Sequence, residues 1–203
     1  MTQWIGKMKN WIFDMDGTLT VAIHDFVAIK RELGLRVSGS ILEQISEMPK
    51  EEQLKINRKL NDLENKIAEN NIRAEGVFEL LTFLKNQNVN LGIVTRNSLE
   101  GVEITLRVTD LEEFFEPKFI LGREFEPHKP DGAAIKHLLN LWNANSEETV
   151  MLGDFKYDLQ AGKDANCKTV HIDAKGDFKF SEFADLEVKS LKEVLNTLAL
   201  TSK

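Results

Sequence analysis

The sequence predicts an α/β protein, with a parallel sheet covered by helices on both faces and a small helical insertion after the first strand. Short apolar runs alternate along the chain with stretches of helical periodicity, which is the order that builds parallel sheets with crossover helices. The first run, residues 11–13, leads into acidic residues and Gly17, as a buried strand does where it enters a loop. The next convincing strand comes only near residue 89, and the interval is typical of helices.

Six strands are expected in all. Short and largely apolar runs are typical of strands buried on both faces of a parallel sheet. After the first run, four others have this character and a weaker sixth precedes the closing helix; they cover residues 89–95, 118–121, 149–152, 168–172 and 186–188.

Helices are expected between these strands. Apolar residues spaced three and four apart form one stripe on a helix, and this stripe packs on the sheet. Three such stripes occur: Val77, Leu80, Leu81 and Leu84; Ile135, Leu138, Leu139 and Trp142; and Leu191, Val194, Leu195 and Leu198.

The insertion is expected to be a small cap domain over the sheet. Its apolar residues form one stripe in each of two expected helices: Val21, Ile23, Phe26 and Ile29, and then Ile56, Leu60, Leu63 and Ile67. Two helices would close a small core of their own. We therefore expect a helical cap domain over residues 21–74 and an α/β core domain over residues 1–20 and 75–203.

The composition is that of an ordinary globular protein. Of 203 residues, 42% are hydrophobic and 29% charged, and the formal net charge of −7 disfavours nucleic acid and anionic membranes as partners. The single cysteine, Cys167, excludes an intrachain disulfide and is expected to fill space before a strand. No stretch approaches the roughly 20 apolar residues of a membrane span, and no apolar leader precedes Asp14, so a cytoplasmic location is expected.

Polar side chains follow several of the expected strands at the point where each strand ends. In strand order they are Asp14 and Asp16; Thr95, Arg96 and Asn97; Lys129; and Asp154 with Asp158. The carboxyl ends of parallel strands meet at one edge of a sheet, where ligands of open α/β sheets bind. We therefore expect a hydroxyl, an ammonium and four carboxylates to gather at this edge.

Several of these groups also have an ordinary structural explanation. Asp154 is placed to cap a helix that begins near Lys156, and Asp158 is placed as a first-turn acid of that helix. Lys129 could be a solvated lysine, and Thr95 an ordinary strand residue. The occurrence of all of them in this order at one edge favours the functional interpretation.

This ordered set resembles the haloacid dehalogenase superfamily, and within it the phosphatases with a small helical cap, such as those like phosphoglycolate phosphatase. The resemblance covers nearly the whole chain, with four motifs in order and a cap in the expected interval. It implies a Rossmann-like sheet and a phosphatase that uses Mg²⁺ and acts on a small phosphorylated metabolite.

The resemblance also implies the catalytic roles. Asp14 resembles the nucleophile that becomes an aspartyl phosphate, and Asp16 resembles the general acid and base. Thr95 is expected to hydrogen-bond the transferring phosphoryl group, and Lys129 to neutralise that group and Asp14. In the dehalogenases themselves the position of Asp16 is not an aspartate, so its presence favours phosphoryl chemistry.

The metal ligands are implied in the same way. Magnesium is expected to be bound by Asp14, Asp154 and the backbone carbonyl of Asp16, with Asp158 supporting the site through water. The sequence offers no cluster of His and Cys of the kind that zinc prefers.

Four further residues are expected to contact the substrate. Gly17 and Thr18 are expected to offer backbone N–H groups to the phosphate. Arg96 either binds a second anionic group of the substrate or pairs with a surface acid, and the same two interpretations apply to Asn97 as a substrate contact or a structural residue. Phe155 departs from the family pattern, because Ser or Thr is common there. Gly132 departs as well, because proline is common at that position. His24, near the start of the insertion, is more readily explained as a structural residue.

Other functions remain open at this stage. A phosphomutase would share the first half-reaction and return the phosphate to its substrate. A non-catalytic binding protein on the same fold would usually lack one of the essential groups, and a signalling receiver phosphorylated on Asp14 would need an uncovered surface. The sequence identifies neither the substrate nor the oligomeric state.

Overall fold

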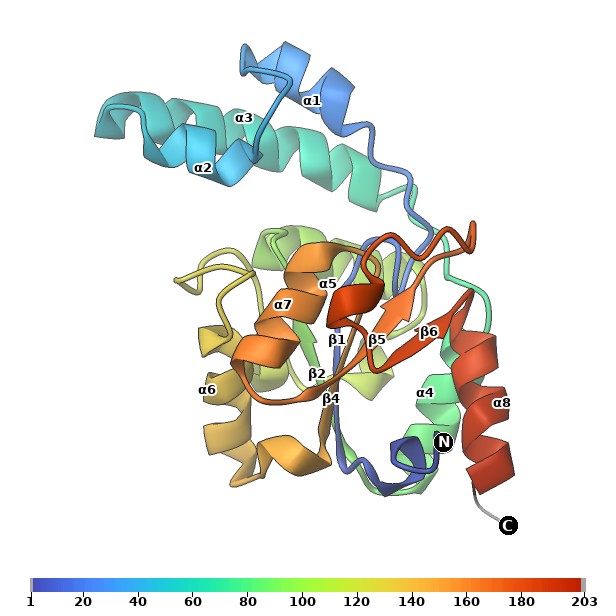
Figure 1. The fold of residues 1–203 in the computed structure, drawn as a ribbon. Helices are drawn as coiled ribbons and strands as arrows, with labels where there is room; N and C mark the ends of the chain where they lie inside the picture. Colours follow the sequence, from blue (N-terminus) through green and yellow to red (C-terminus); the bar gives the residue numbers. More distant parts are fainter. Residues whose placement is uncertain (1, 202–203) are drawn as a thin grey trace.

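The computed structural model describes residues 2–201, which form a six-stranded parallel sheet and eight α-helices (Figure 1). The strands are β1 (Asn10–Phe13), β2 (Asn90–Val94), β3 (Ile120–Leu121), β4 (Thr149–Gly153), β5 (Lys168–Ile172) and β6 (Leu186–Val188). The helices are α1 (Phe26–Leu33), α2 (Ile41–Ser46), α3 (Lys50–Ala68), α4 (Val77–Asn86), α5 (Leu99–Val108), α6 (Ala133–Trp142), α7 (Lys156–Asp164) and α8 (Leu191–Thr201). The predicted α/β class with a Rossmann-like parallel sheet is confirmed.

The sheet has the strand order β3-β2-β1-β4-β5-β6, with β1 at its centre. Ile12 of β1 pairs with Gly92 on one side and with Met151 on the other. The chain runs from β1 outward to β3 and then returns to the opposite side of β1 with β4, so the direction of strand order reverses at β1. Ligands of open α/β sheets bind beside such a reversal, at the carboxyl ends of the strands.

Successive residues of β1 point into two separate hydrophobic layers. Trp11 and Phe13 lie in the layer formed with α4, α5 and α8, whereas Ile12 lies in the layer formed with α6 and α7. Figure 1 shows α6 and α7 on one side of the sheet and α4 and α8 on the other. The strand is buried on both faces, which explains why residues 11–13 are apolar rather than alternating.

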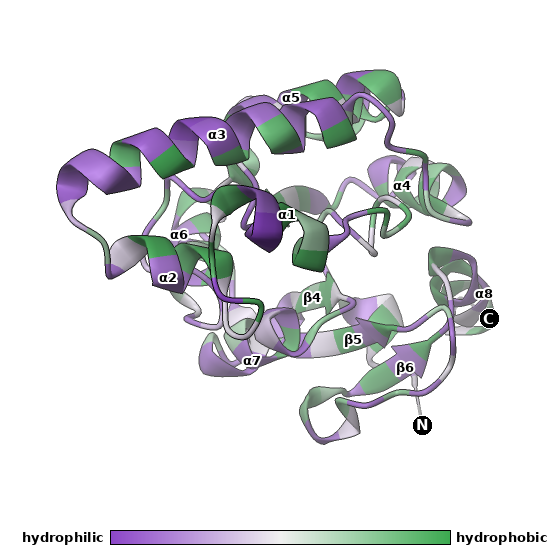
Figure 2. Cartoon of the chain, turned by 90° about the horizontal axis from the view of Figure 1, so that it is seen from above, coloured by the Kyte–Doolittle hydropathy of each residue, from purple (hydrophilic) through white to green (hydrophobic). Residues whose placement is uncertain are grey.

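Helices α1, α2 and α3, together termed the helical insert, form a layer above the carboxyl edge of the sheet (Figure 1). Their own hydrophobic cluster is centred on Ile29, Leu33, Leu35, Ile45 and Leu60, with Ile56, Leu63 and Ile67 packed against it. The predicted apolar stripe of α3 therefore packs inside the insert, and Figure 2 shows much of α3 as hydrophilic from above. Within residues 2–201 no helix is both long and apolar enough to cross a bilayer. The domain boundaries at residues 20/21 and 74/75 stay a prediction.

Two predictions about the helices of the insert are wrong. The insert has three helices rather than two, because Ser40 caps the additional short helix α2 with its side chain. The first helix also begins later than its apolar residues indicated: Val21 and Ile23 precede it and are exposed. It begins at Phe26 because the Asp25 carboxylate accepts two backbone N–H groups of the first turn.

The predicted strand over residues 118–121 is shorter than expected. Residues Pro117–Phe119 form a 3-10 turn, and only Ile120 and Leu121 pair with β2. Pro117 favours this turn because its ring fixes a helical φ and its missing N–H is not needed at the first position.

The chain leaves and re-enters the core through two adjacent segments. Thr20 and Arg73 form an antiparallel bridge, and the N–H of Val21 donates to the Ile72 carbonyl at 3.0 Å. The two connections to the insert therefore lie side by side at the edge of the sheet that follows β1.

Candidate active site

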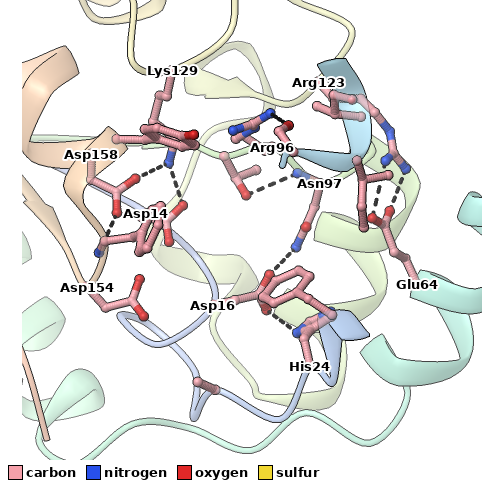
Figure 3. Close-up of a pocket in the computed structure, with 18 of the residues that line it drawn as sticks. Asp14, Asp16, His24, Glu64, Arg96, Asn97, Arg123, Lys129, Asp154 and Asp158 are labelled. Carbon is pink, nitrogen blue, oxygen red and sulfur yellow. Dashed lines mark hydrogen bonds and ion pairs between the residues drawn. The ribbon is translucent and has the colours of Figure 1, made fainter. Parts of the chain in front are cut away.

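A cavity of about 340 Å³ lies between the helical insert and the carboxyl edge of the sheet. It is lined by eight residues that the sequence predicted for the site: Asp14, Asp16, Thr95, Arg96, Asn97, Lys129, Asp154 and Asp158. Figure 3 labels all of these side chains except Thr95, and it shows the labelled ones coming from separate elements and converging on one space. The volume is at the lower end of the range for small-molecule sites.

Lys129 is the positive centre of this cavity. Its Nζ lies 2.6 Å from Asp14 Oδ1 and 2.6 Å from Asp158 Oδ1, and donates to the Val94 carbonyl at 2.7 Å. Burial alone would lower the pKa of the ammonium, but the two carboxylates outweigh that effect and the pKa is raised. Lys129 is therefore a buried and charged group, and the alternative of a solvated lysine is wrong.

Asp154 comes close to Asp14 and Asp158 because Gly17 leaves room for it. Carboxylate oxygens of the three aspartates lie within 4.8 Å of one another. Gly17 has φ +81°, and a Cβ at this position would lie 2.3 Å from Asp154 Oδ2. Only glycine combines this backbone conformation with the close approach of the carboxylate.

Asp158 has a structural contact as well as its place in this cluster. It lies in the first turn of α7, where its Oδ2 accepts the backbone N–H of Phe155 at 3.0 Å. Its other oxygen faces Lys129. The first-turn role considered from the sequence and the place in the carboxylate cluster therefore coexist in one side chain.

Burial and crowding raise the pKa of two carboxyl groups in the cluster. For Asp14, burial and then the charge of Asp158 raise the pKa to about 7, although Lys129 opposes the shift. For Asp154, burial followed by the charges of Asp158 and Asp14 raises the pKa to about 8. A single ammonium thus faces three carboxylates, and the cluster lacks positive charge.

The cluster fits a hard divalent cation. All of its potential ligand atoms are carboxylate oxygens, and over residues 2–201 no His or Cys joins the group. Oxygen donors suit magnesium, whereas zinc favours nitrogen and sulfur. A divalent cation would supply the charge that Lys129 alone does not provide.

Asp16 has polar neighbours on two sides. Its Oδ2 accepts a hydrogen bond from Asn97 Nδ2 at 2.6 Å, and its Oδ1 lies 3.5 Å from Nδ1 of His24 (Figure 3). The imidazole stacks on the ring of Phe26. Among the described residues, Asp16 Oδ1 and His24 Nδ1 have no hydrogen-bond partner. His24, expected from the sequence to be structural, therefore lines the cavity beside Asp16.

Thr95 faces the cavity from the end of β2, whereas Gly17 and Thr18 do not line it. The Oγ1 of Thr95 accepts the Asn97 backbone N–H at 3.3 Å, which leaves the hydroxyl proton for a ligand. The backbone N–H of Thr18 donates to the Met15 carbonyl at 3.3 Å. In this structure that N–H is used inside its own turn, contrary to the expectation of a phosphate contact, and the visible contribution of Gly17 is steric.

Arg123 joins the sheet to the insert, and the sequence analysis missed it. It follows β3 and forms an ion pair with Glu64 of α3, with Nη1 3.2 Å from Oε1, while Nη2 donates to Asn61 Oδ1 at 2.7 Å. Burial raises the pKa of Glu64 and Arg123 opposes this without cancelling it. A polar residue just beyond a strand was the only signal, because no local pattern pairs residues 59 positions apart.

Arg96 lines the same cavity with different partners. Its Nη2 donates to Ser40 Oγ at 2.6 Å, and its guanidinium carbon lies 5.1 Å from the centre of the Tyr157 ring. Tyr157 in turn makes an edge contact with Phe155, which stands where the family often has Ser or Thr. An aromatic pair from the sheet side thus supports this arginine.

Comparisons with known proteins agree with this geometry. A family model described as haloacid dehalogenase-like hydrolase matches residues 11–172. A haloacid dehalogenase-like hydrolase domain-containing protein of Arabidopsis thaliana is 31% identical over 210 residues, covering 95% of this chain and 84% of that protein. The pyrophosphatase PpaX of Bacillus cereus is 30% identical over 184 residues, covering 82% of this chain and 83% of PpaX.

Solved structures share the fold along nearly the whole chain. A hydrolase from Pseudomonas syringae superposes with a TM-score of 0.81 at 20% identity, covering 95% of this chain and 98% of that one. CbbY from Rhodobacter sphaeroides, solved with phosphate, gives a TM-score of 0.73 at 20% identity, covering 95% and 99%. From the family match and the Arabidopsis relative, this chain belongs to the haloacid dehalogenase-like hydrolases.

Proposed function

We propose that this hydrolase is a magnesium-dependent phosphatase that cleaves a small phosphate monoester through an aspartyl phosphate on Asp14. The observation that carries the proposal is the buried Lys129 ammonium, 2.6 Å from Asp14 and beside a cluster of carboxylates. A carboxylate attacks a phosphate group only where positive charge offsets their mutual repulsion. Lys129 supplies part of that charge from a fixed position.

In the first half-reaction Asp14 attacks phosphorus with Oδ2, because its Oδ1 accepts a hydrogen bond from Lys129. A bond forms between this oxygen and phosphorus while the bond to the leaving oxygen breaks. Asp16, held by Asn97, gives its proton to the leaving oxygen and releases an alcohol. The Thr95 hydroxyl donates a hydrogen bond to an oxygen of the transferring group.

In the second half-reaction Asp16 takes a proton from a water molecule, which attacks phosphorus. Inorganic phosphate leaves, and Asp14 returns to a carboxylate. Asp14, Asp154 and the backbone carbonyl of Asp16 would hold the magnesium ion, with Asp158 acting through water, and the ion neutralises phosphoryl charge when bound. The ammonium of Lys129, which lies between Asp14 and Asp158, offsets the negative charge of the phosphoryl group as well.

The substrate class follows from the size of the site. A cavity of about 340 Å³ suits a small phosphorylated metabolite better than a macromolecule. Relatives named as pyrophosphatase PpaX make pyrophosphate a compound to include among the candidates.

The test is a panel of phosphate monoesters and pyrophosphate, assayed for released phosphate with Mg²⁺ and with EDTA. Asp14→Asn provides the blank, because it keeps the shape of the side chain and removes the nucleophile. We expect magnesium-dependent phosphate release that falls at least about 10⁴-fold in this variant. Circular dichroism of the variant tests whether it is folded.

Two outcomes would contradict the proposal. Full activity in Asp14→Asn would exclude this residue as the nucleophile. Transfer of phosphate to a second position on the substrate, with none released to water, would instead indicate a phosphomutase.

A further inference from the structure

We infer that Arg96 forms a subsite for a second anionic group of the substrate, a carboxylate or a second phosphate. This inference rests on the proposed phosphatase function and names the substrate class within it: small phosphate esters that carry another negative group. The observation behind it is a guanidinium in the cavity that forms no ion pair with any carboxylate of residues 2–201.

The charges that line the cavity leave Arg96 unpaired. Five carboxylates line it: Asp14, Asp16, Glu64, Asp154 and Asp158. Within residues 2–201 each has other neighbours, namely Lys129, Asn97 or Arg123, or lies in the cluster that fits a cation. None of them forms an ion pair with Arg96, whose contacts are a hydroxyl and an aromatic ring.

These two contacts orient Arg96 without using up its donors. A guanidinium carries five N–H groups in a planar fork. Ser40 Oγ accepts a hydrogen bond from Nη2 of Arg96, and the guanidinium carbon lies 5.1 Å from the centre of the Tyr157 ring. The remaining N–H groups suit the paired oxygens of a carboxylate or a phosphate, which a guanidinium binds in a bidentate way.

The position of Arg96 limits how far the second anion lies from the reacting phosphate. Arg96 stands between Thr95, which faces the phosphoryl site, and Asn97, which holds Asp16. Arg96 and Thr95 both line one cavity of about 340 Å³, which favours a short alcohol portion between the two anions. Lys30 lines the insert side of the cavity and donates to the Val37 carbonyl. It has no carboxylate partner among the described residues, so it adds to the positive potential there.

Arg123 shows what a purely structural arginine looks like in the same cavity. It is neutralised by Glu64 and hydrogen-bonded to Asn61, so it fastens the insert to the sheet. If Arg96 only fastened the insert through Ser40, removing its charge would slow all substrates alike. A subsite instead predicts a loss confined to substrates with a second anion.

The experiment uses two matched pairs of esters with Mg²⁺. One pair is 2-phosphoglycolate and 2-hydroxyethyl phosphate; the other is propane-1,3-diol bisphosphate and 3-hydroxypropyl phosphate. The pairs separate a carboxylate from a phosphate as the second anion. We expect the wild-type kcat/KM to favour the anionic member of at least one pair by about 10-fold or more.

Arg96→Gln should reduce that preference to within about 3-fold, because it removes one charge-assisted contact. The kcat/KM of the ester without a second anionic group should stay nearly unchanged. Glutamine keeps an amide that can hydrogen-bond to Ser40, and Arg96→Ala provides a second variant. Measured melting temperatures test whether both variants fold. Arg36→Gln is the matched control, since Arg36 lies on the insert surface and pairs with Glu47 there.

Three results would overturn the inference. One is equal kcat/KM for the two members of each pair, so that the second anionic group makes no difference; this result would leave the phosphatase proposal intact. Another is an equal loss on both members in Arg96→Gln, which would make Arg96 a fastening residue. Failure to hydrolyse any of the esters, or pyrophosphate, would contradict the phosphatase proposal and this inference together.

Discussion

The two sides of the cavity are built in different ways. On the sheet side, Asp14, Thr95 and Asp154 each follow directly from a strand end, so the register of β1, β2 and β4 sets their positions. On the insert side, helices with a small core of their own meet the sheet through a few polar contacts. Arg123 with Glu64, and Arg96 with Ser40, are two of them.

This difference separates the chemistry from the selectivity. Groups that must stay fixed to move a phosphoryl group come from a hydrogen-bonded sheet buried on both faces. Arg96, which we assign to the rest of the substrate, also follows a strand, but it donates to Ser40 of the insert, so its position depends on how that layer lies. A layer over a site can open and close to admit substrate. We expect changes on the sheet side to reduce turnover and stability together, and changes across the contact to alter access and selectivity.

The largest effect is expected for Lys129→Met on the sheet side. It leaves Asp14 and Asp158 buried without their counter-charge, which should lower the free energy of unfolding by about 3–5 kcal/mol. Because the nucleophile loses its neutralising partner, kcat should fall at least about 10³-fold. Denaturant unfolding and steady-state kinetics measure the two effects.

Lys136→Met is the control for this prediction. Lys136 makes the same kind of ion pair with Asp164 on the exposed surface, so its removal should change neither quantity. Similar losses in both variants would mean that the burial of Lys129 is not what matters.

The next effect is expected for Gly17→Ala. The added methyl group lies where Asp154 now approaches, and φ +81° is strained for alanine, at a cost of about 1–3 kcal/mol. Displacing the carboxylate should lower kcat by about 10- to 100-fold. Gly34→Ala is the matched control, since Gly34 has φ +73° with nothing near its Cβ position. Gly34→Ala should lower the free energy of unfolding through backbone strain and leave kcat unchanged. A Gly17→Ala enzyme with wild-type kcat would contradict the steric role of Gly17.

A smaller effect is expected for Glu64→Ala, which tests the contact between the two sides. It leaves Arg123 without its carboxylate and should weaken docking of the insert by roughly 1–2 kcal/mol. Hydrogen exchange in α3 should quicken while the sheet amides keep their protection. Asp62→Ala, which changes an exposed acid on the same helix, is the control and should alter neither the docking of the insert nor hydrogen exchange in α3. Equal quickening in the sheet would show that the two sides unfold as one unit.

The last prediction concerns the pH dependence of stability. Unfolded aspartates have a pKa near 4, whereas folding raises the pKa of Asp14 to about 7 and that of Asp154 to about 8. The folded state therefore binds these protons more tightly, and the metal-free protein should lose stability as pH rises from about 4 to about 8. In EDTA the melting temperature should therefore fall over this pH range.

Magnesium should reverse this fall, because it binds the deprotonated carboxylates. Its stabilising effect should therefore be larger near pH 8 than near pH 5, and thermal unfolding with and without the ion measures it. Asp154→Asn should flatten the pH dependence. A melting temperature that rises with pH in EDTA would contradict the assignment of these shifts.

The sheet side could be predicted from the sequence because its geometry is local. Each of Asp14, Thr95 and Asp154 is the first residue beyond an apolar run, and parallel strands bring such positions to one edge. The contact between Asp16 and Asn97 needed only that the ends of β1 and β2 be neighbours. The convergence of these side chains at one edge could therefore be predicted from the sequence.

The insert side could not be predicted in the same detail. Helix α2 is a single short segment whose apolar residues are too few to establish a period. The pairing of Arg123 with Glu64 depends on how α3 lies above the sheet, which no pattern within either segment encodes. The contact of Arg96 with Tyr157 of α7 likewise depends on side-chain directions that packing decides.

The bridge between Thr20 and Arg73 has an evolutionary consequence. Because the two crossings are neighbours, any module whose ends lie about one strand spacing apart, roughly 4.8 Å, could replace the present one without rerouting the sheet. A lineage could then exchange lids as cassettes and acquire new substrates, while the reaction beneath them stayed the same.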